Sequence, residues 1–131
     1  MSHPHHILVR AFFDGLAKGE IPPDLLSHDM TVWTTTGGNN PRERYLQGAK
    51  ILQSLFPDGL RYMVETVTAE GDRAVAEVHG EGTLRNGNEY RNDYVFVFEI
   101  RDGQIVHLKE HANPEPIQTR IKPLLMAASG G

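Results

Sequence analysis

The amino-acid sequence predicts an α+β fold in which helices cover one face of a curved, mostly antiparallel sheet. Apolar residues recur at helical spacing in the first half of the chain, and β-rich segments joined by short turns fill the second half. Helices followed by an antiparallel meander are typical of this class. The 131 residues suit a single domain, 1–131, whose ends at about 1–5 and 127–131 we expect to be flexible.

Three helices are predicted in the N-terminal half. Apolar periodicity indicates the first helix over about residues 6–18. Pro22-Pro23 opens a short second helix, because proline is favoured in the first helical turn. A third amphipathic helix extends from about residue 45 to 56 and ends at Pro57-Asp58-Gly59.

Five strands are predicted, and the first lies between the second and third helices. Residues 31–36 are β-branched or aromatic, and a loop of residues 37–41 follows them. Four further strands form a meander: 60–69, 73–84, 89–101 and 104–111. The segment 116–126 is predicted to be either a short terminal helix or an extended tail.

Charge and composition exclude several classes of function. The net charge is −4 and there is no basic cluster, so nucleic-acid binding is not expected. Cysteine is absent, which removes thiol nucleophiles and disulfides and fits the cytoplasmic location that we expect. No apolar run reaches the length of a membrane span, and the N-terminus lacks the features of a signal peptide, so no membrane partner is expected.

No metal or other cofactor is predicted. His3, His5 and His6 could bind a transition metal, but chain ends usually fray, and we expect a solvated tail. His79 and Glu81 could join Glu110 around a metal, but their spacing is not that of a known ligand set.

Glu110 is the strongest candidate for a catalytic residue. Alternation along the last predicted strand places it on the same face as Val106 and Leu108. A carboxylate at the end of an apolar row is partly desolvated, so its pKa rises toward neutrality and it can act as a general acid or base. The alternative is that Glu110 lies in water or pairs with an arginine at the strand end.

Aromatic residues provide further candidates. Trp33 and Phe13 could stack on a flat ligand or belong to the core, and we expect Trp33 to line a pocket together with Glu110. The hydroxyls of Tyr45 and Tyr94 could point into that pocket or satisfy backbone carbonyls.

A homodimer is also expected. Apolar residues occupy both faces of the segment 94–100, and the helices of one domain can cover only one of them. Phe96 and Phe98 are therefore predicted to belong to the core or to a sheet-to-sheet dimer interface.

The order of elements resembles the nuclear-transport-factor-two-like fold, which includes SnoaL-like and ketosteroid isomerase-like proteins. Similarity to the phenazine biosynthesis protein A/B family extends from about Met30 to Ile121. It is carried by Val32-Trp33-Thr34-Thr35, Phe56-Pro57-Asp58, His79-Gly80-Glu81-Gly82, Tyr90-Arg91-Asn92-Asp93-Tyr94 and Glu110-His111-Ala112-Asn113-Pro114. The resemblance implies a cone-like, curved, mixed but mostly antiparallel sheet, with three N-terminal helices enclosing an apolar pocket.

The resemblance also implies roles for particular residues. The glutamate that matches Glu110 is thought to act as an acid/base on ketone-bearing rings in the phenazine family. Asp93 falls within one or two residues of the protonated aspartate of ketosteroid isomerase. Phe12 and Thr34 occupy the approximate places of its oxyanion-binding tyrosine and its base, and neither can perform that chemistry.

We therefore predict a protein that binds an apolar or aromatic small molecule. The expected activity is that of a cofactor-independent isomerase, cyclase, dehydratase or condensing enzyme, with Glu110 as acid/base on a carbonyl-bearing substrate. Asp93, His79 or Tyr94 would polarise or orient that substrate. The predicted substrate-binding residues are Trp33, Phe13, Tyr45, Tyr94 and Phe56.

Two alternatives remain open at this point. The first is a non-catalytic ligand-binding or dimerisation module of the same fold. The second is water activation of the kind found in limonene-epoxide hydrolases, which needs an Asp-Arg-Asp set that is not recognisable in the sequence.

Overall fold

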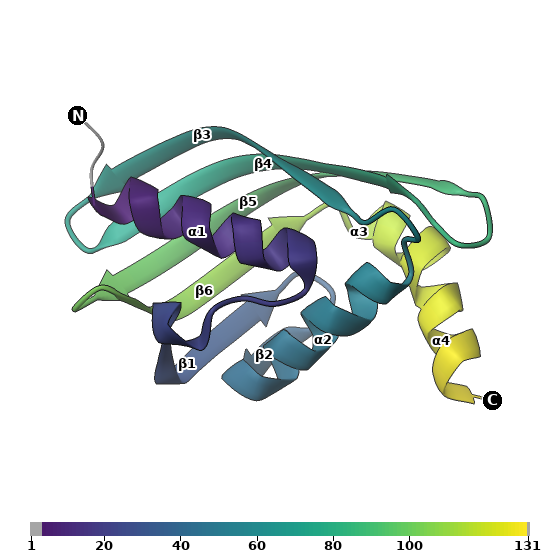
Figure 1. Cartoon of the computed structure of the whole chain (residues 1–131), viewed down its shortest axis with the longest axis horizontal. Helices are drawn as coiled ribbons and strands as arrows, with labels where there is room; N and C mark the ends of the chain where they lie inside the picture. The colour runs from purple at the N-terminus through teal and green to yellow at the C-terminus, as the bar shows by residue number, and fades with distance from the viewer. Residues whose placement is uncertain (1–3, 131) are drawn as a thin grey trace.

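The computed structural model describes residues 4–130, and these form one six-stranded sheet with helices on one side (Figure 1). The elements are α1 (Pro4–Lys18), a 3₁₀ turn (Pro23–Leu25), β1 (Leu26–Thr34), β2 (Gly38–Pro41), α2 (Arg42–Ser54), β3 (Arg61–Glu70), β4 (Arg73–Thr83), β5 (Glu89–Arg101), β6 (Gln104–Ala112), α3 (Pro114–Pro116), a π-helical turn (Ile117–Ile121) and α4 (Lys122–Gly130). The predicted α+β fold, with three helical elements before the meander, is confirmed. Residues 1–3 and 131, which belong to the ends predicted to be flexible, lie outside the described residues.

The sheet is mixed and open. Its strand order is β2-β1-β6-β5-β4-β3, in which only β1 and β6 pair in parallel. Asp102 and Gly103 both have positive φ, at 52° and 75°, as the tight hairpin between β5 and β6 requires. The prediction of a mixed, mostly antiparallel sheet is therefore confirmed.

The core lies between α1 and the concave face of the sheet, which α1 crosses in Figure 1. Phe12 packs on Phe98 with ring centroids 5.2 Å apart, and Phe13 packs on Phe96 at 4.8 Å. Both pairs are edge-to-face, an arrangement that adds to the energy gained from burial. Of the two alternatives for Phe96 and Phe98, the structure therefore selects the core.

Strand β1 is longer than predicted, and β2 was predicted to be a loop. β1 begins at Leu26, but its register shifts between Leu26 and Thr31, and this irregularity breaks the period of two that marks a strand in sequence. β2 consists of Gly38–Pro41, whose composition indicates a turn. Its position at the sheet edge explains why a strand with glycine and proline is tolerated there.

The first helix also begins earlier than predicted, at Pro4. Proline suits the first helical turn, where its missing N–H is not needed. His5 and His6 therefore lie in α1 rather than in a solvated tail, and His5 Nε2 is 2.8 Å from the carbonyl oxygen of Gly71. His3 lies outside the described residues.

The C-terminal segment is helical, which resolves the choice between helix and tail. Asn113 begins this segment, and its side chain accepts a hydrogen bond from the backbone N–H of Glu115 at 3.1 Å. Ile117, Ile121 and Leu125 are spaced four residues apart and line the cavity described below.

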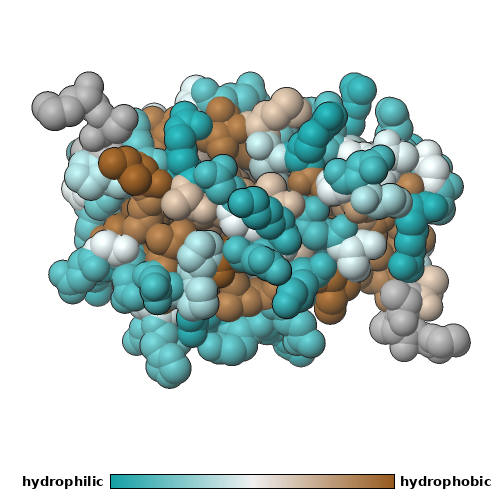
Figure 2. Space-filling model, in the orientation of Figure 1, coloured by the Kyte–Doolittle hydropathy of each residue, from teal (hydrophilic) through white to brown (hydrophobic). Residues whose placement is uncertain are grey.

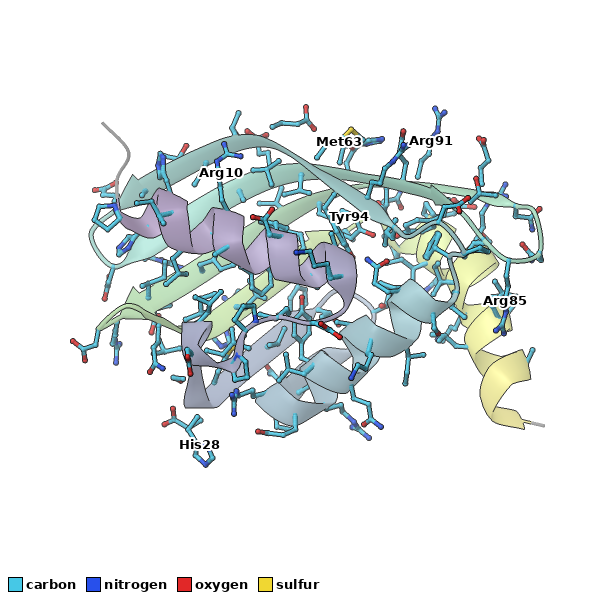
Figure 3. All side chains as sticks on the ribbon, viewed as in Figure 1. Arg10, His28, Met63, Arg85, Arg91 and Tyr94 are labelled. Atoms are coloured by element: carbon cyan, nitrogen blue, oxygen red, sulfur yellow. The ribbon has the colours of Figure 1, made fainter. Side chains whose placement is uncertain are left out.

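The outer face of the sheet carries exposed apolar residues among polar ones. Met63 and Val95 are 42% and 38% exposed, and Figure 3 shows Met63 and Arg91 projecting outward while Tyr94 lies within the molecule. The sheet-to-sheet homodimer stays a prediction. None of the helices in the described part of the chain is long and apolar enough to cross a membrane.

Two glycines provide a matched test of helix packing. A Cβ atom at Gly15 in α1 would lie 2.8 Å from both Ile21 Cα and Pro22 Cδ, so we expect Gly15→Ala to destabilise the fold by about 1–3 kcal/mol. A Cβ at Gly48 in α2 meets nothing within 4 Å, so Gly48→Ala should stabilise by up to about 1 kcal/mol. Urea unfolding of the two variants checks this, and a Gly15→Ala protein as stable as the parent would contradict the packing described here.

Candidate active site

A cavity of about 400 Å³ lies between the sheet and the helices, within the size range of small-molecule sites. Its walls come from α1, α2, β1, β3, β5, β6 and the C-terminal helical segment. The wall is mostly apolar: Leu16, Ala49, Leu52, Ile117, Ile121 and Leu125 contribute to it. In Figure 2, apolar residues remain visible between the polar side chains that cover this side of the molecule.

Glu110 on β6 is the only acidic residue among the described residues that line this cavity. Its position differs from the predicted row in one respect. A register shift in the β5–β6 pairing falls at Val106, so buried Ile105, rather than Val106, precedes Leu108 on the inner side. No ion pair among the described residues includes Glu110, so the predicted alternative of an arginine partner is wrong.

The carboxyl group of Glu110 is held by one hydrogen bond, and the residue is half-buried in the cavity wall. Tyr45 Oη on α2 donates to Glu110 Oε1 at 2.9 Å. Burial disfavours the charged carboxylate and raises the pKa of Glu110 to about 7, while the hydrogen bond from Tyr45 acts in the opposite direction. A carboxyl with a pKa near neutrality can both accept and return a proton at physiological pH.

All four tyrosines of the chain line the cavity with Glu110. Tyr45 is bonded to Glu110, and Tyr90 and Tyr94 are bonded to each other with their hydroxyl oxygens 2.6 Å apart. Burial is the largest cause that raises the pKa of each of the four, and the charge of Glu110 raises each further. The four phenols therefore remain neutral hydrogen-bond donors around Glu110.

Trp33 does not lie beside Glu110, and the prediction that it lines this cavity is wrong. In the parallel pairing of β1 with β6, Trp33 is opposite Lys109 and Thr34 is opposite Glu110. Because neighbours along a strand point to opposite faces, Trp33 lies on the outer face, where its ring packs on His111 at 4.9 Å. Thr34 is the residue of this strand that reaches the cavity.

His79 and Asp93 also lie on the outer face and not in the cavity. His79 Nδ1 is 2.8 Å from Asp93 Oδ1, and His79 Nε2 is 3.2 Å from Glu81 Oε2. The side chain of Asp93 is 85% exposed, and its hydrogen bond is the main cause that raises the pKa of His79. These two residues cannot polarise a ligand beside Glu110. His79 and Glu81 lie together on the outer face and Glu110 lines the cavity, so among the described residues these three do not come together as a metal site.

Two other predicted substrate contacts belong to the core. Phe13 packs among the aromatic rings under α1, and Phe56 packs on Tyr90 with ring centroids 6.0 Å apart. Phe56 also explains the glycine at position 82, because a Cβ there would lie 2.8 Å from its ring. Tyr45 and Tyr94 are the predicted contacts that do line the cavity.

Tyr62, Tyr90 and the C-terminal helical segment are also parts of the site, and they were not predicted from the sequence. Tyr90 could have been found, because it is four residues before Tyr94 on one strand and therefore shares its face. Tyr62 offered only the weaker signal of alternation along β3, and the C-terminal residues depend on a helix that the sequence did not settle.

Comparison with known proteins identifies the family to which this fold belongs. The family model of the SnoaL-like domain matches residues 9–108, which is most of the chain. The chain therefore belongs to the SnoaL-like domain family, within the nuclear-transport-factor-two-like proteins.

Individual relatives agree with this assignment. An uncharacterized PhzA/B-like protein of Pseudomonas aeruginosa is 37% identical over 65 residues, and this match spans 46% of the present chain and 46% of that protein. A nuclear-transport-factor-two-like protein from Anabaena variabilis is 27% identical, with a TM-score of 0.73 over 86% of this chain and 94% of that one.

Two more distant structures share the fold. An epoxide hydrolase from M. tuberculosis, similar to limonene-epoxide hydrolases, has a TM-score of 0.72 at 14% identity, covering 98% of this chain and 97% of that one. A protein from Jannaschia described provisionally as a SnoaL-like polyketide cyclase has a TM-score of 0.77 at 19% identity, covering 90% and 91%.

The raised pKa of Glu110 predicts a pH-dependent stability. The unfolded chain ionises this carboxyl near pH 4.5 and the folded protein near pH 7, so between these values the unfolded state binds fewer protons. The stabilisation that Glu110 contributes is therefore complete below about pH 4.5 and is lost as the pH rises through about 7.

We expect the free energy of unfolding of the parent, minus that of Glu110→Gln, to fall by on the order of 2 kcal/mol between pH 4.5 and 7.5. Urea unfolding of both proteins at several pH values measures this difference, from which other titrating groups cancel. A difference that stays constant or rises with pH would show that the carboxyl is not desolvated.

The hydrogen bond from Tyr45 predicts a second shift. Removal of this donor in Tyr45→Phe should raise the pKa of Glu110 above about 7, because the bond favours the carboxylate. Tyr62→Phe removes a cavity hydroxyl that makes no hydrogen bond to Glu110 and is the matched control. NMR titration of the glutamate carboxyl carbons reports both values, and equal shifts in the two variants would contradict a specific role for Tyr45.

Proposed function

We propose that the protein binds an apolar, carbonyl-bearing small molecule and that Glu110 transfers a proton at the carbon next to the carbonyl. The observation that supports this most strongly is a single carboxyl with a pKa of about 7, placed in a mostly apolar cavity of about 400 Å³. Such a group matches the requirement of general acid–base catalysis, in which the pKa of the catalytic residue lies near the working pH.

The reaction begins with the ionised form of Glu110. Its carboxylate takes a proton from the carbon beside the carbonyl, and the electron pair of that C–H bond forms the double bond of an enolate. Protonated Glu110 then returns the proton at another atom, which gives isomerisation, or to a leaving hydroxyl, which gives dehydration. Attack of the enolate carbon on a second carbonyl of the same molecule gives cyclisation, with Glu110 supplying the proton to the new alkoxide.

The composition of the cavity favours this chemistry over epoxide hydrolysis. Among the described lining residues there is one carboxylate, Glu110, and the cation Arg44 is exposed and bonded to Asn40 at 3.5 Å. An Asp-Arg-Asp set for activating water is therefore not present in this lining. Polyketides are rich in carbonyl groups, so the structural similarity to the Jannaschia protein supports the same substrate class.

Glu110→Gln tests the proposal directly, because glutamine keeps the size and can still accept the hydrogen bond from Tyr45, but cannot exchange a proton. We expect turnover to fall by roughly 10²–10⁴ and ligand affinity to change much less. In the parent, the rate of proton abstraction should rise with pH through about 7, as Glu110 ionises. A screen of cyclic ketones and polyketide-like compounds, run with a binding assay on the same compounds, provides the measurement.

Glu65→Gln is the matched control, since Glu65 is exposed on β3 and outside the cavity lining. It should leave turnover unchanged. Equal activity in Glu110→Gln and the parent would overturn the proposed role. Binding without turnover in either protein would favour the alternative of a non-catalytic binding module.

A further inference from the structure

The side-chain amide of Asn92 on β5 is held in one orientation by the backbone of Asn113. Asn92 is 4% exposed, its Nδ2 donates to the carbonyl oxygen of Asn113 at 2.9 Å, and its Oδ1 accepts from the N–H of Asn113 at 3.1 Å. A backbone carbonyl can only accept and a backbone N–H can only donate, so the amide cannot be reversed. The second hydrogen on Nδ2 therefore donates to Tyr90 Oη, 2.9 Å away.

This orientation determines the number of free protons in the Tyr90–Tyr94 pair. The two hydroxyls carry two protons, and one of them occupies the 2.6 Å hydrogen bond between the oxygens. If Tyr90 donates to Tyr94, the proton of Tyr94 is free. If Tyr94 donates to Tyr90, then Tyr90 accepts two hydrogen bonds and its own proton is free. In both cases one O–H donor remains, and no hydrogen bond within the described part of the chain uses it.

The free donor belongs to one of two residues that both line the cavity that holds Glu110. Tyr90 and Tyr94 both line this cavity, and the charge of Glu110 raises the pKa of each, so the pair lies within electrostatic reach of the carboxyl. A hydroxyl in a mostly apolar cavity has few other acceptors, and an acceptor on a bound ligand would satisfy it.

We propose that the Tyr90–Tyr94 pair, polarised by Asn92, binds the oxyanion of the ligand. The inference rests on the proposed function and specifies its substrate class as enolisable ketones. Phenolate ions resemble the enolates that these ketones form. When Glu110 removes the proton, the carbonyl π electrons move to oxygen, and the free phenolic proton donates a hydrogen bond to that oxygen. Donors placed where charge develops are a major source of catalysis in enzymes that form oxyanions.

The number of free hydroxyl protons predicts that the single and double tyrosine variants behave differently. In Tyr94→Phe, Tyr90 keeps its bond from Asn92 and its own proton becomes free, and in Tyr90→Phe the proton of Tyr94 becomes free. Each single variant therefore keeps one donor, whereas the double variant Tyr90→Phe/Tyr94→Phe has none. Tyr62 is unchanged in all three proteins, so any hydrogen bond that it makes to the ligand cancels from the comparison.

The experiment measures binding of 4-nitrophenolate and of nitrobenzene, which has a similar shape without the oxyanion, by calorimetry. The Glu110→Gln background removes repulsion between the carboxylate and the phenolate. We expect the double variant to raise the dissociation constant of 4-nitrophenolate by roughly 10–100-fold, and each single variant by less than about 5-fold. Nitrobenzene should change by less than about 2-fold throughout. The proposal would be overturned if the double variant weakened the binding of both probes equally. It would also be overturned if each single variant weakened 4-nitrophenolate binding as much as the double variant does.

A second measurement needs no tyrosine variant and covers the case in which the double variant does not fold. In the proton NMR spectrum of Glu110→Gln, a hydroxyl resonance of the Tyr90–Tyr94 pair should move downfield when 4-nitrophenolate binds and not when nitrobenzene binds, whereas no change with 4-nitrophenolate would overturn the oxyanion site. Neither measurement depends on turnover. If Glu110→Gln kept the turnover of the parent, the proposed function would therefore be overturned. The binding of 4-nitrophenolate would still decide, on its own, whether the tyrosine pair binds an oxyanion.

Discussion

The site depends on one constraint, the enclosure of a carboxyl group in a mostly apolar cavity. The free energy of ionising Glu110 there is higher than in water, and this brings its pKa to about 7. The hydrogen bond from Tyr45 works against burial and keeps the carboxylate accessible at neutral pH. Without the cavity, Glu110 would be permanently ionised at neutral pH, and with a buried cation beside it the proton would be lost even more readily.

The cavity in turn depends on how the C-terminal segment is attached to the sheet. Asn113 caps the start of the helical segment through its side chain and binds Asn92 through its backbone. The same residue therefore starts the helix that carries Ile117 and Ile121 into the cavity wall and fixes the amide that orients Tyr90. Closure of the cavity and orientation of its hydroxyl groups are coupled through a few hydrogen bonds at one end of β5 and β6.

The sequence was sufficient to predict five of the six strands, all except β2, and less so which way each side chain points. Glu110 was placed correctly because Leu108 shares its face in either register. Trp33 was misplaced because the face of β1 depends on its parallel pairing with β6, a contact between segments more than 70 residues apart that alternation within one segment cannot reveal. The prediction that Asp93 faces the ligand was wrong for a related reason. A one-residue uncertainty in alignment reverses the face of the sheet to which a side chain points, and the inner positions beside Asp93 belong to Asn92 and Tyr94.

The choice of tyrosine as the surrounding polar residue follows from the same constraint that raises the pKa of Glu110. A lysine or arginine against the carboxyl would stabilise the carboxylate, lower its pKa and remove its ability to return a proton. A phenol donates a hydrogen bond without carrying charge, and both burial and the nearby carboxylate raise its pKa, so it keeps its proton while Glu110 titrates. Neutral donors beside a carboxyl that changes charge near pH 7 form a site in which the negative charge can pass from Glu110 to a ligand oxygen and back. The cavity can therefore support both positions of the charge, which is the condition that proton transfer next to a carbonyl imposes.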